Sequence, residues 1–127
     1  MSFRTYKHDN YSLIVFSTDK LDSIVAPDLK SELVLITKSG ERNIIMDMSE
    51  VKYCDSSGLS AILTGHRLCQ QAQGEFIICN LQPNVDKLIK ISQLTTIISI
   101  TESLPKAIDL LYEKQLMQNP EENSSNE

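Results

Sequence analysis

The sequence predicts an α/β domain built on a mixed, mostly parallel sheet of about five strands with about four helices. Short runs of β-branched residues alternate with longer segments in which apolar residues recur every three or four positions. Parallel strands joined in this way need right-handed helical crossovers, and the chain shows no internal repeat. Its 127 residues, of which 41% are hydrophobic, suit one domain with a real core.

The first elements are a hairpin and a helix. Residues 3–7 alternate in polarity, Leu13-Ile14-Val15-Phe16 is β-branched and aromatic, and Asp9-Asn10 between them is a turn signal. From Ser23 to Lys38 the apolar residues recur at helical spacing, and Ser39-Gly40 is a stop signal. The apolar positions of this helix are Val25, Leu29, Leu33 and Ile36.

The middle of the chain predicts the central strand of the sheet. Residues 43–48 are short and almost continuously apolar, as in a strand covered on both faces. A helix from about Ser57 to Gln73 follows, ended by Gly74, and then comes a strand over residues 76–79. The inner face of this helix is expected to carry Leu59, Ile62, Leu63, His66 and Cys69.

The last third predicts two helices around one strand. Pro83 opens the first helix, residues 97–100 form the strand, and residues 104–116 form the second helix. The inward positions of the first helix are expected to be Val85, Leu88, Ile89 and Ile91. A single domain over residues 1–116 is therefore predicted, followed by a disordered acidic tail over residues 117–127.

Composition narrows the function classes. A net charge of -5 and a pI near 5.0 disfavour nucleic acid and membrane surfaces as partners, which leaves proteins. Cys54, Cys69 and Cys79 lack Cys-x-x-Cys spacing and form no zinc set with the two histidines, so no metal site is expected. Reduced thiols, together with the lack of a signal peptide or a membrane-spanning run, predict a cytoplasmic protein.

The best candidate for a functional site is the segment Asp55-Ser56-Ser57-Gly58, which links the central strand to the following helix. Functional sites of open α/β sheets lie at the carboxyl ends of strands. A serine here can cap the helix, and an attached phosphate would be favoured by the helix dipole but repelled by Asp55. From the residues alone, simple helix capping by Ser56 and Ser57, with Asp55 helping the dipole, is the favoured explanation of this segment.

Beyond these physical arguments, Asp55-Ser56-Ser57-Gly58-Leu59 after the strand Ile44-Ile45-Met46-Asp47-Met48 resembles the signature of bacterial STAS domains, specifically the anti-sigma factor antagonists. Leu21-Asp22 resembles the family's approach to its first helix, and Pro83-Asn84-Val85-Asp86-Lys87-Leu88 resembles the opening of its third helix. The resemblance covers roughly residues 3–112.

The resemblance implies a phosphorylation switch at Ser56, with Ser57 as the second choice. The implied partner-binding residues are Asp22, Asp55, Ser56, Ser57 and Gly58. It also implies that the unphosphorylated protein binds an anti-sigma factor serine kinase, so that the sigma factor is released, and that a PP2C-type phosphatase resets the cycle. The chain would then be a substrate and not an enzyme, and it would need no cofactor, because the kinase binds ATP.

The sequence departs from the family at two turns. Asp19 and Gln93 stand where glycine is common, so either the turn geometry or the partner contacts there are expected to differ. Asp22 either contributes to the partner surface or only interacts with the helix dipole. A Ser-His-Asp enzyme is disfavoured because His66 lies about two and a half turns along the helix from Ser56, and a packed histidine explains it better. Lys52 and Tyr53 share the site's loop but are not included in the predicted site.

Two other functions remain open. A STAS scaffold with the same fold could serve a non-sigma regulator such as a phosphatase, a cyclase or a sensory complex. Alternatively, the strand-to-helix loop could bind a nucleotide or another small ligand, because helix N-termini receive anions. The sequence does not predict an oligomeric state.

Overall fold

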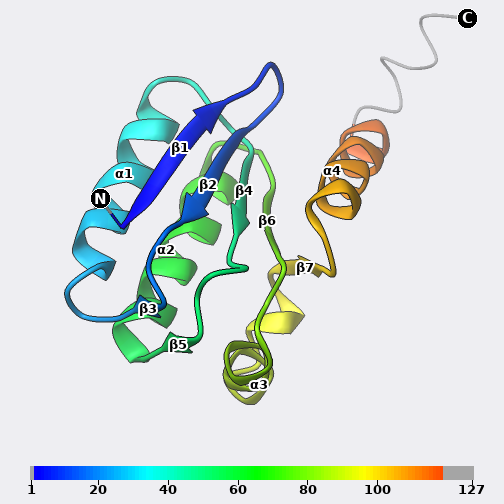
Figure 1. Ribbon diagram of the computed structural model, residues 1–127. Coiled ribbons are helices and arrows are strands. Elements are labelled where there is room, and N and C mark those ends of the chain that lie inside the picture. The colour runs from blue at the N-terminus through cyan, green and yellow to red at the C-terminus, as the bar shows by residue number, and fades with distance from the viewer. Residues whose placement is uncertain (1, 119–127) are drawn as a thin grey trace, which may run out of the picture.

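The computed structural model describes residues 2–118, which form a five-stranded sheet in the order β1-β2-β4-β6-β7 (Figure 1). β1 pairs antiparallel with β2, and the other neighbours pair in parallel, which confirms the predicted hairpin and the mixed, mostly parallel sheet. The strands are β1 (Phe3–Lys7), β2 (Ser12–Phe16), β4 (Ile44–Asp47), β6 (Phe76–Cys79) and β7 (Ser99–Thr101).

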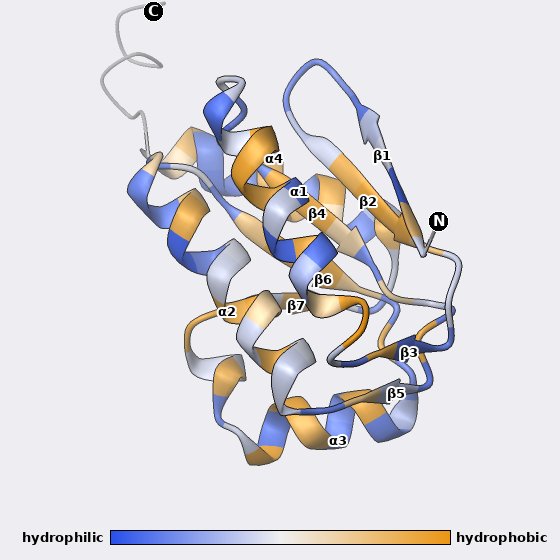
Figure 2. Ribbon diagram, turned by 90° about the vertical axis from the view of Figure 1, so that its left-hand side faces the viewer, coloured by the Kyte–Doolittle hydropathy of each residue, from blue (hydrophilic) through white to orange (hydrophobic). Residues whose placement is uncertain are grey.

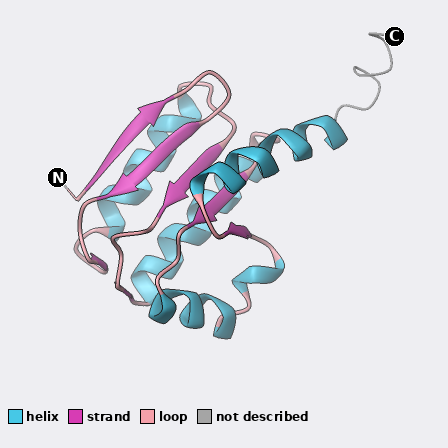
Figure 3. Cartoon of the chain, turned by 45° about the vertical axis from the view of Figure 1, so that its right-hand side comes forward, coloured by secondary structure: helices cyan, strands magenta, loops and turns pink. Residues whose placement is uncertain are grey.

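The described helices cover the sheet unequally. Figure 3 shows α1 and α2 on one face and α4 on the other. The third helix, α3, lies beyond the carboxyl ends of the strands, next to β5 (Tyr53–Cys54) (Figure 1). The helices are α1 (Ala26–Lys38), α2 (Ser56–Gln71), α3 (Pro83–Ile91) and α4 (Leu104–Gln118), with the short 3-10 turn η1 at Leu94–Thr96.

Two apolar cores lie on the two faces of the sheet. β6 is buried at all four of its positions, and β4 at Ile44, Ile45 and Met46, as the continuous apolar run of the central strand predicted. Ile44 and Met46 face the larger core under α1 and α2, whereas Ile45 faces the smaller core under α4. Figure 2 shows apolar residues gathered along β2 and β4. Successive side chains of β4 therefore pack against the helices on opposite faces of the sheet.

The predicted inner face of α2 is partly wrong. Leu63 and His66 are only half-buried, and the buried residues of this helix are Gly58, Ala61, Ile62, Gly65 and Cys69. A pattern of large apolar residues overlooks these small ones, which let α2 pack closely against α1 and β6. Consequently His66 is not a core histidine.

The segment after α3 also differs from the prediction. Ile91 is 69% exposed rather than inward. Ile97 is 49% exposed because it caps the end of η1, where its N–H donates to the Leu94 carbonyl oxygen, so the strand predicted over residues 97–100 begins only at Ser99. Gln93 adopts a φ of 64°, the left-handed conformation that favours glycine, so this turn keeps that geometry without the glycine. At Asp19 the described backbone needs no positive φ.

Helix ends shift by a few residues. The first helix begins at Ala26 rather than Ser23, and α4 continues to Gln118, two residues beyond the predicted domain end. At the end of α2 the left-handed residue is Gln73, with φ 61°, and not Gly74. Gly74 is instead required for close packing, because a Cβ there would clash with the Arg42 carbonyl group. The predicted tail from residue 119 onward lies outside the described residues.

None of the helices within residues 2–118 is long and apolar enough to span a bilayer. The same part of the chain has no cluster of three His, Cys, Asp or Glu side chains suited to a metal ion. All three cysteines are free and buried. Burial raises the pKa of the Cys54, Cys69 and Cys79 thiols from 9.0 to about 12, so these side chains stay protonated and unreactive near neutral pH.

These raised pKa values predict a loss of stability in alkali. Above about pH 9 the unfolded chain releases thiol protons that the folded chain retains, so the free energy of unfolding falls as the pH rises towards the folded pKa near 12. Between about pH 8 and pH 10, Cys79→Ala should lose roughly 1 kcal/mol less of its unfolding free energy than the wild type, because it lacks one of these thiols. Urea unfolding at the two pH values measures this difference.

The matched control is Ile78→Val, which shortens a neighbouring buried side chain without removing a titratable group. Its loss of unfolding free energy between the two pH values should equal that of the wild type. An unchanged alkaline loss in Cys79→Ala would contradict the raised thiol pKa.

Candidate functional site

The candidate site lies at the carboxyl end of β4, where a short loop leads through β5 into α2 (Figure 1). Asp47 holds this loop, because its Oδ1 accepts hydrogen bonds from the Ser49 backbone N–H at 3.0 Å and from Asn80 Nδ2 at 3.2 Å. Gln82 Nε2 donates to the Ser49 carbonyl oxygen at 2.6 Å. The loop is therefore tied to the end of β6 before it reaches the helix.

A second, two-stranded sheet brings the remaining site residues together. β3 (Lys20–Leu21) pairs in parallel with β5, and the Leu21 carbonyl oxygen accepts from the Asp55 backbone N–H at 3.3 Å. The sequence analysis did not predict this pairing, because strands of two residues carry too little pattern to recognise. It places the turn at Asp22 next to the start of α2.

The N-cap of α2 is Asp55, not a serine. Its backbone is extended, and its Oδ1 accepts from the Gly58 backbone N–H at 3.0 Å. Ser56 is the first helical residue and is exposed, whereas Ser57 is half-buried. No hydrogen bond joins the Ser56 hydroxyl to another residue within 2–118, so this hydroxyl is available to a partner.

Gly58 allows the close contact between α2 and β3. A Cβ at this position would clash with the Leu21 carbonyl oxygen and would lie 2.6 Å from Cys54 Sγ. Gly58 is buried, so it positions the helix start and offers little surface to a partner. The structure therefore gives Gly58 a packing role, and its role as a partner-binding residue stays a prediction.

Asp22 also has a local structural role. Its Oδ1 accepts from the backbone N–H groups of Ile24 at 3.1 Å and Val25 at 3.3 Å, which shapes the turn before α1. This Asx-type turn lies ahead of the helix, so Asp22 is not a residue of the first helical turn. The Asp22 carboxylate remains half-exposed, and its neighbour Leu21 contacts the start of α2 through Asp55.

A shallow depression of about 270 Å³ joins the two helix starts. It is lined by Ser23, Ala26, Pro27, Lys30, Ser56, Ser57 and Ser60. Lys30 is the one cation among these lining residues. The sequence analysis did not identify Lys30, because its spacing places it on an ordinary polar side of the first helix.

Two large exposed side chains lie on the segments that lead into α1 and α2. Ile24 is 80% exposed next to Ser23, and Tyr53 is 52% exposed on β5. Ile24 falls outside the apolar spacing of Val25, Leu29 and Leu33, and this mismatch is the signal that indicates a surface role. The site thus combines an exposed hydroxyl, acidic groups and apolar side chains, which suits binding to a protein.

The close contact at Gly58 predicts a destabilised Gly58→Ala variant. The added methyl group must displace the Leu21 backbone or the Cys54 side chain, which should lower the free energy of unfolding by roughly 1–3 kcal/mol. Urea unfolding monitored by circular dichroism measures this change.

Ser60→Ala is the control for Gly58→Ala, since Ser60 is exposed on the same helix. It should change the free energy of unfolding by less than about 0.5 kcal/mol. Equal stability of the Gly58→Ala variant and the wild type would refute the packing role of Gly58.

Comparison with known proteins agrees with this geometry. The STAS domain pattern matches residues 2–107. The chain is 31% identical over 83 residues to BtrV of Bordetella bronchiseptica, provisionally named an anti-sigma factor antagonist; the match covers 65% of this chain and 72% of BtrV. It is 26% identical over 100 residues to the anti-sigma-B factor antagonist of Listeria monocytogenes, covering 79% of this chain and 88% of the relative.

The fold is also that of a solved structure, the anti-sigma factor antagonist SpoIIAA in its unphosphorylated form. The TM-score is 0.69 at 18% identity, and the match covers 87% of this chain and 97% of SpoIIAA. The family pattern spans most of the chain and includes every residue of the candidate site. The chain therefore belongs to the STAS domain family.

Proposed function

We propose that this protein is an anti-sigma factor antagonist controlled by phosphorylation of Ser56. In its unphosphorylated form it binds an anti-sigma factor serine kinase, and the kinase then releases its sigma factor. Phosphorylation ends this binding, and a PP2C-type phosphatase restores it. The observation that carries the proposal is the exposed Ser56 hydroxyl at the start of α2, directly after the capping Asp55. The names of the curated relatives point the same way.

Accessibility favours Ser56 over Ser57 as the modified residue. A kinase must bring the acceptor hydroxyl to its own catalytic groups, and Ser56 is exposed whereas Ser57 is half-buried. Asp55, and not Ser56, provides the helix cap. Modification of Ser56 would therefore leave the capping hydrogen bond to Gly58 in place.

A phosphate on Ser56 changes the charge of the surface more than its shape. It adds about -1.5 to -2 charges next to Asp55, on a surface where Lys30 is the only lining cation of the depression. The helix dipole and Lys30 favour the phosphate, while Asp55 opposes it. A partner that fits the neutral hydroxyl would meet uncompensated negative charge after phosphorylation.

The depression itself suits protein contact better than a small ligand. Its volume of about 270 Å³ is below the roughly 300–1,000 Å³ of usual ligand pockets. Ile24 and Tyr53, which are exposed on the segments before α1 and α2, offer apolar contacts of the kind that protein interfaces use. These features favour a binding surface over the nucleotide-binding alternative.

Site-specific phosphorylation is the first prediction of this function. Incubation of the full chain with ATP and each anti-sigma factor kinase of its own genome should give one phosphate, which mass spectrometry maps to Ser56. Ser56→Ala should abolish the modification because it removes the acceptor hydroxyl. Ser57→Ala should still carry the phosphate on Ser56, since it removes only the second-choice acceptor. Thr64→Ala, which lies on the same helix about two turns away and outside the depression, should be modified like the wild type.

Absence of phosphate at Ser56 with every kinase, when each is active on another substrate, would refute this function. A pull-down that then recovers a phosphatase, a cyclase or a sensory complex would assign the chain to the alternative scaffold role.

Kinase binding should respond to charge at Ser56. Ser56→Ala should bind the kinase with wild-type affinity, whereas Ser56→Asp should weaken binding at least about tenfold, or about 1.4 kcal/mol, because it places a charge in the interface. Isothermal titration calorimetry measures both affinities.

Thr64→Asp is the matched control for this experiment. It adds the same charge to the same helix about two turns further on, and its affinity should stay within about twofold of the wild type. Equal affinity of Ser56→Asp and Ser56→Ala would argue against a charge-controlled switch.

A further inference from the structure

A second cavity lies at the end of the molecule opposite the candidate site. It has a volume of about 590 Å³, within the usual range for small-molecule sites. Its walls come from the second half of α2, the starts of β6 and β7, α4 and the loop before β4. Because α2 has 16 residues, about 24 Å of helix separates its two ends.

We propose that this cavity binds a small polar metabolite carrying an oxyanion, such as a phosphate monoester or a carboxylate. Two cations line it, Arg42 and Lys114, against a single acid, Glu75. The lining is thus positive although the whole chain carries a net charge of -5. This inference is independent of the function proposed for Ser56.

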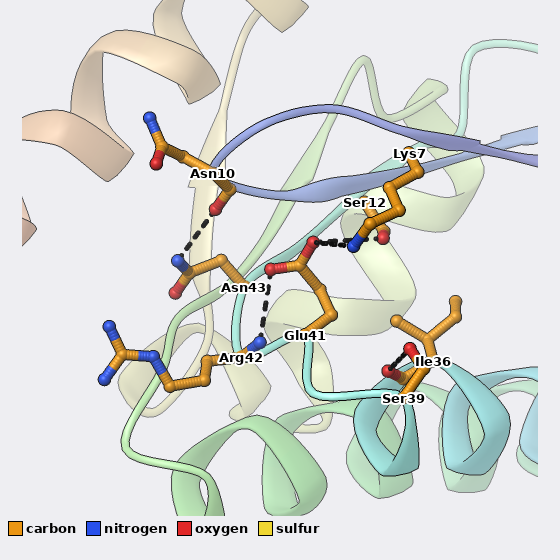
Figure 4. A network of polar contacts seen from close by, with 8 residues as sticks. All are labelled: Lys7, Asn10, Ser12, Ile36, Ser39, Glu41, Arg42 and Asn43. Carbon is orange, nitrogen blue, oxygen red and sulfur yellow. Dashed lines mark hydrogen bonds and ion pairs between the residues drawn. The ribbon is translucent and has the colours of Figure 1, made fainter.

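Arg42 is the residue that suits an oxyanion best. Its guanidinium forms no ion pair or hydrogen bond with another residue in the described part of the chain, and Figure 4 shows the side chain pointing away from the network that holds its backbone. A guanidinium offers paired N–H donors that match a phosphate or a carboxylate. An anion entering the cavity would supply the partner that Arg42 lacks.

The backbone of Arg42 is held in place while its side chain stays available. Its N–H donates to Glu41 Oε2 at 3.2 Å, and Glu41 is buried. On the other side, Gly74 packs so closely that a Cβ there would clash with the Arg42 carbonyl group. A fixed backbone lowers the entropy cost of binding.

Lys114 provides a second, adaptable cation. Its Nζ lies 3.5 Å from Glu75 Oε1, and the lysine side chain is more than a third exposed. Such an ion pair contributes little to stability, so the ammonium can turn towards a bound anion at small cost. Arg42 and Lys114 would then approach the oxyanion from different elements.

The other lining residues indicate what kind of molecule carries the oxyanion. Gln70 and Gln73 offer amides, Ser99 a hydroxyl and His66 an imidazole, whereas Phe76 supplies an apolar wall. Mixed donors and acceptors match hydroxyl groups of a small metabolite better than they match a hydrocarbon chain. This role also accounts for the half-buried position of His66, which the sequence analysis assigned to the core.

Titration of the full chain with glucose 6-phosphate tests the site, with glucose as the uncharged comparison and citrate and inorganic phosphate as further anions. In NMR spectra, glucose 6-phosphate should produce saturable shifts of the His66 ring. His8, which stacks on Tyr11 outside the cavity lining, should not respond. Glucose should cause no saturable shift, and added salt should weaken binding of the phosphate. Citrate stronger than inorganic phosphate would identify carboxylate as the preferred oxyanion, and the reverse would identify phosphate.

Arg42→Ala should weaken binding at least about tenfold, because it removes a charge-assisted contact. Lys30→Ala removes a cation from the depression at the other end and should bind like the wild type. Arg42→Lys keeps the charge and should show an intermediate affinity. Circular dichroism confirms that each variant is folded.

Three results would overturn the site. One is the absence of saturable shifts with any of the anions, and another is equal binding by the wild type and Arg42→Ala. The third is binding of a hexaglutamate peptide without binding of the small anions, which would assign the cavity to an acidic protein segment.

Discussion

The fold depends on how Asn43 anchors the start of the central strand. Its carbonyl oxygen accepts from the Ser12 N–H at 3.0 Å, and its Nδ2 donates to the Asn10 carbonyl oxygen at 2.9 Å (Figure 4). Its Oδ1 accepts from the Glu75 N–H at 2.9 Å. One buried side chain thus joins the hairpin, β4 and β6, and its polar atoms are satisfied. Because the register of a strand decides which face each side chain takes, this anchor supports both cores.

The same anchor sets the positions of both ends of the sheet. At one end, Arg42 is the residue directly before Asn43, so the contacts that fix β4 also place the cavity lining. At the other end, β4 delivers the chain to the loop held by Asp47 and Gln82. The main sheet alone would leave Asp22 and Asp55 unconnected. The short β3–β5 pairing and the close packing at Gly58 join them.

The sequence predicted what depends on long patterns. The hairpin, the central strand and the four helices follow from apolar spacing and from stop signals, and the resemblance indicated the family. Patterns of large apolar residues failed where small residues pack, as on α2, and at Ile97, which caps η1 instead of starting the predicted strand. The two-residue strands depend on tertiary contacts that no local pattern encodes. The sequence indicated the segment Asp55-Ser56-Ser57-Gly58 as a site. Only the structure shows that Asp55 caps α2, that Gly58 allows close packing and that Ser56 is exposed.

That division of roles explains how the proposed phosphorylation of Ser56 would act without refolding the domain. Asp55 satisfies a first-turn N–H of α2, and Gly58 fixes the distance between the helix and β3. Ser56 does neither, so its hydroxyl is not needed for stability. If Ser56 were the cap, a phosphate would compete with the helix start and couple modification to local unfolding. With Asp55 as the cap, added charge acts on the surface seen by a partner, while the cores and the sheet remain as they are.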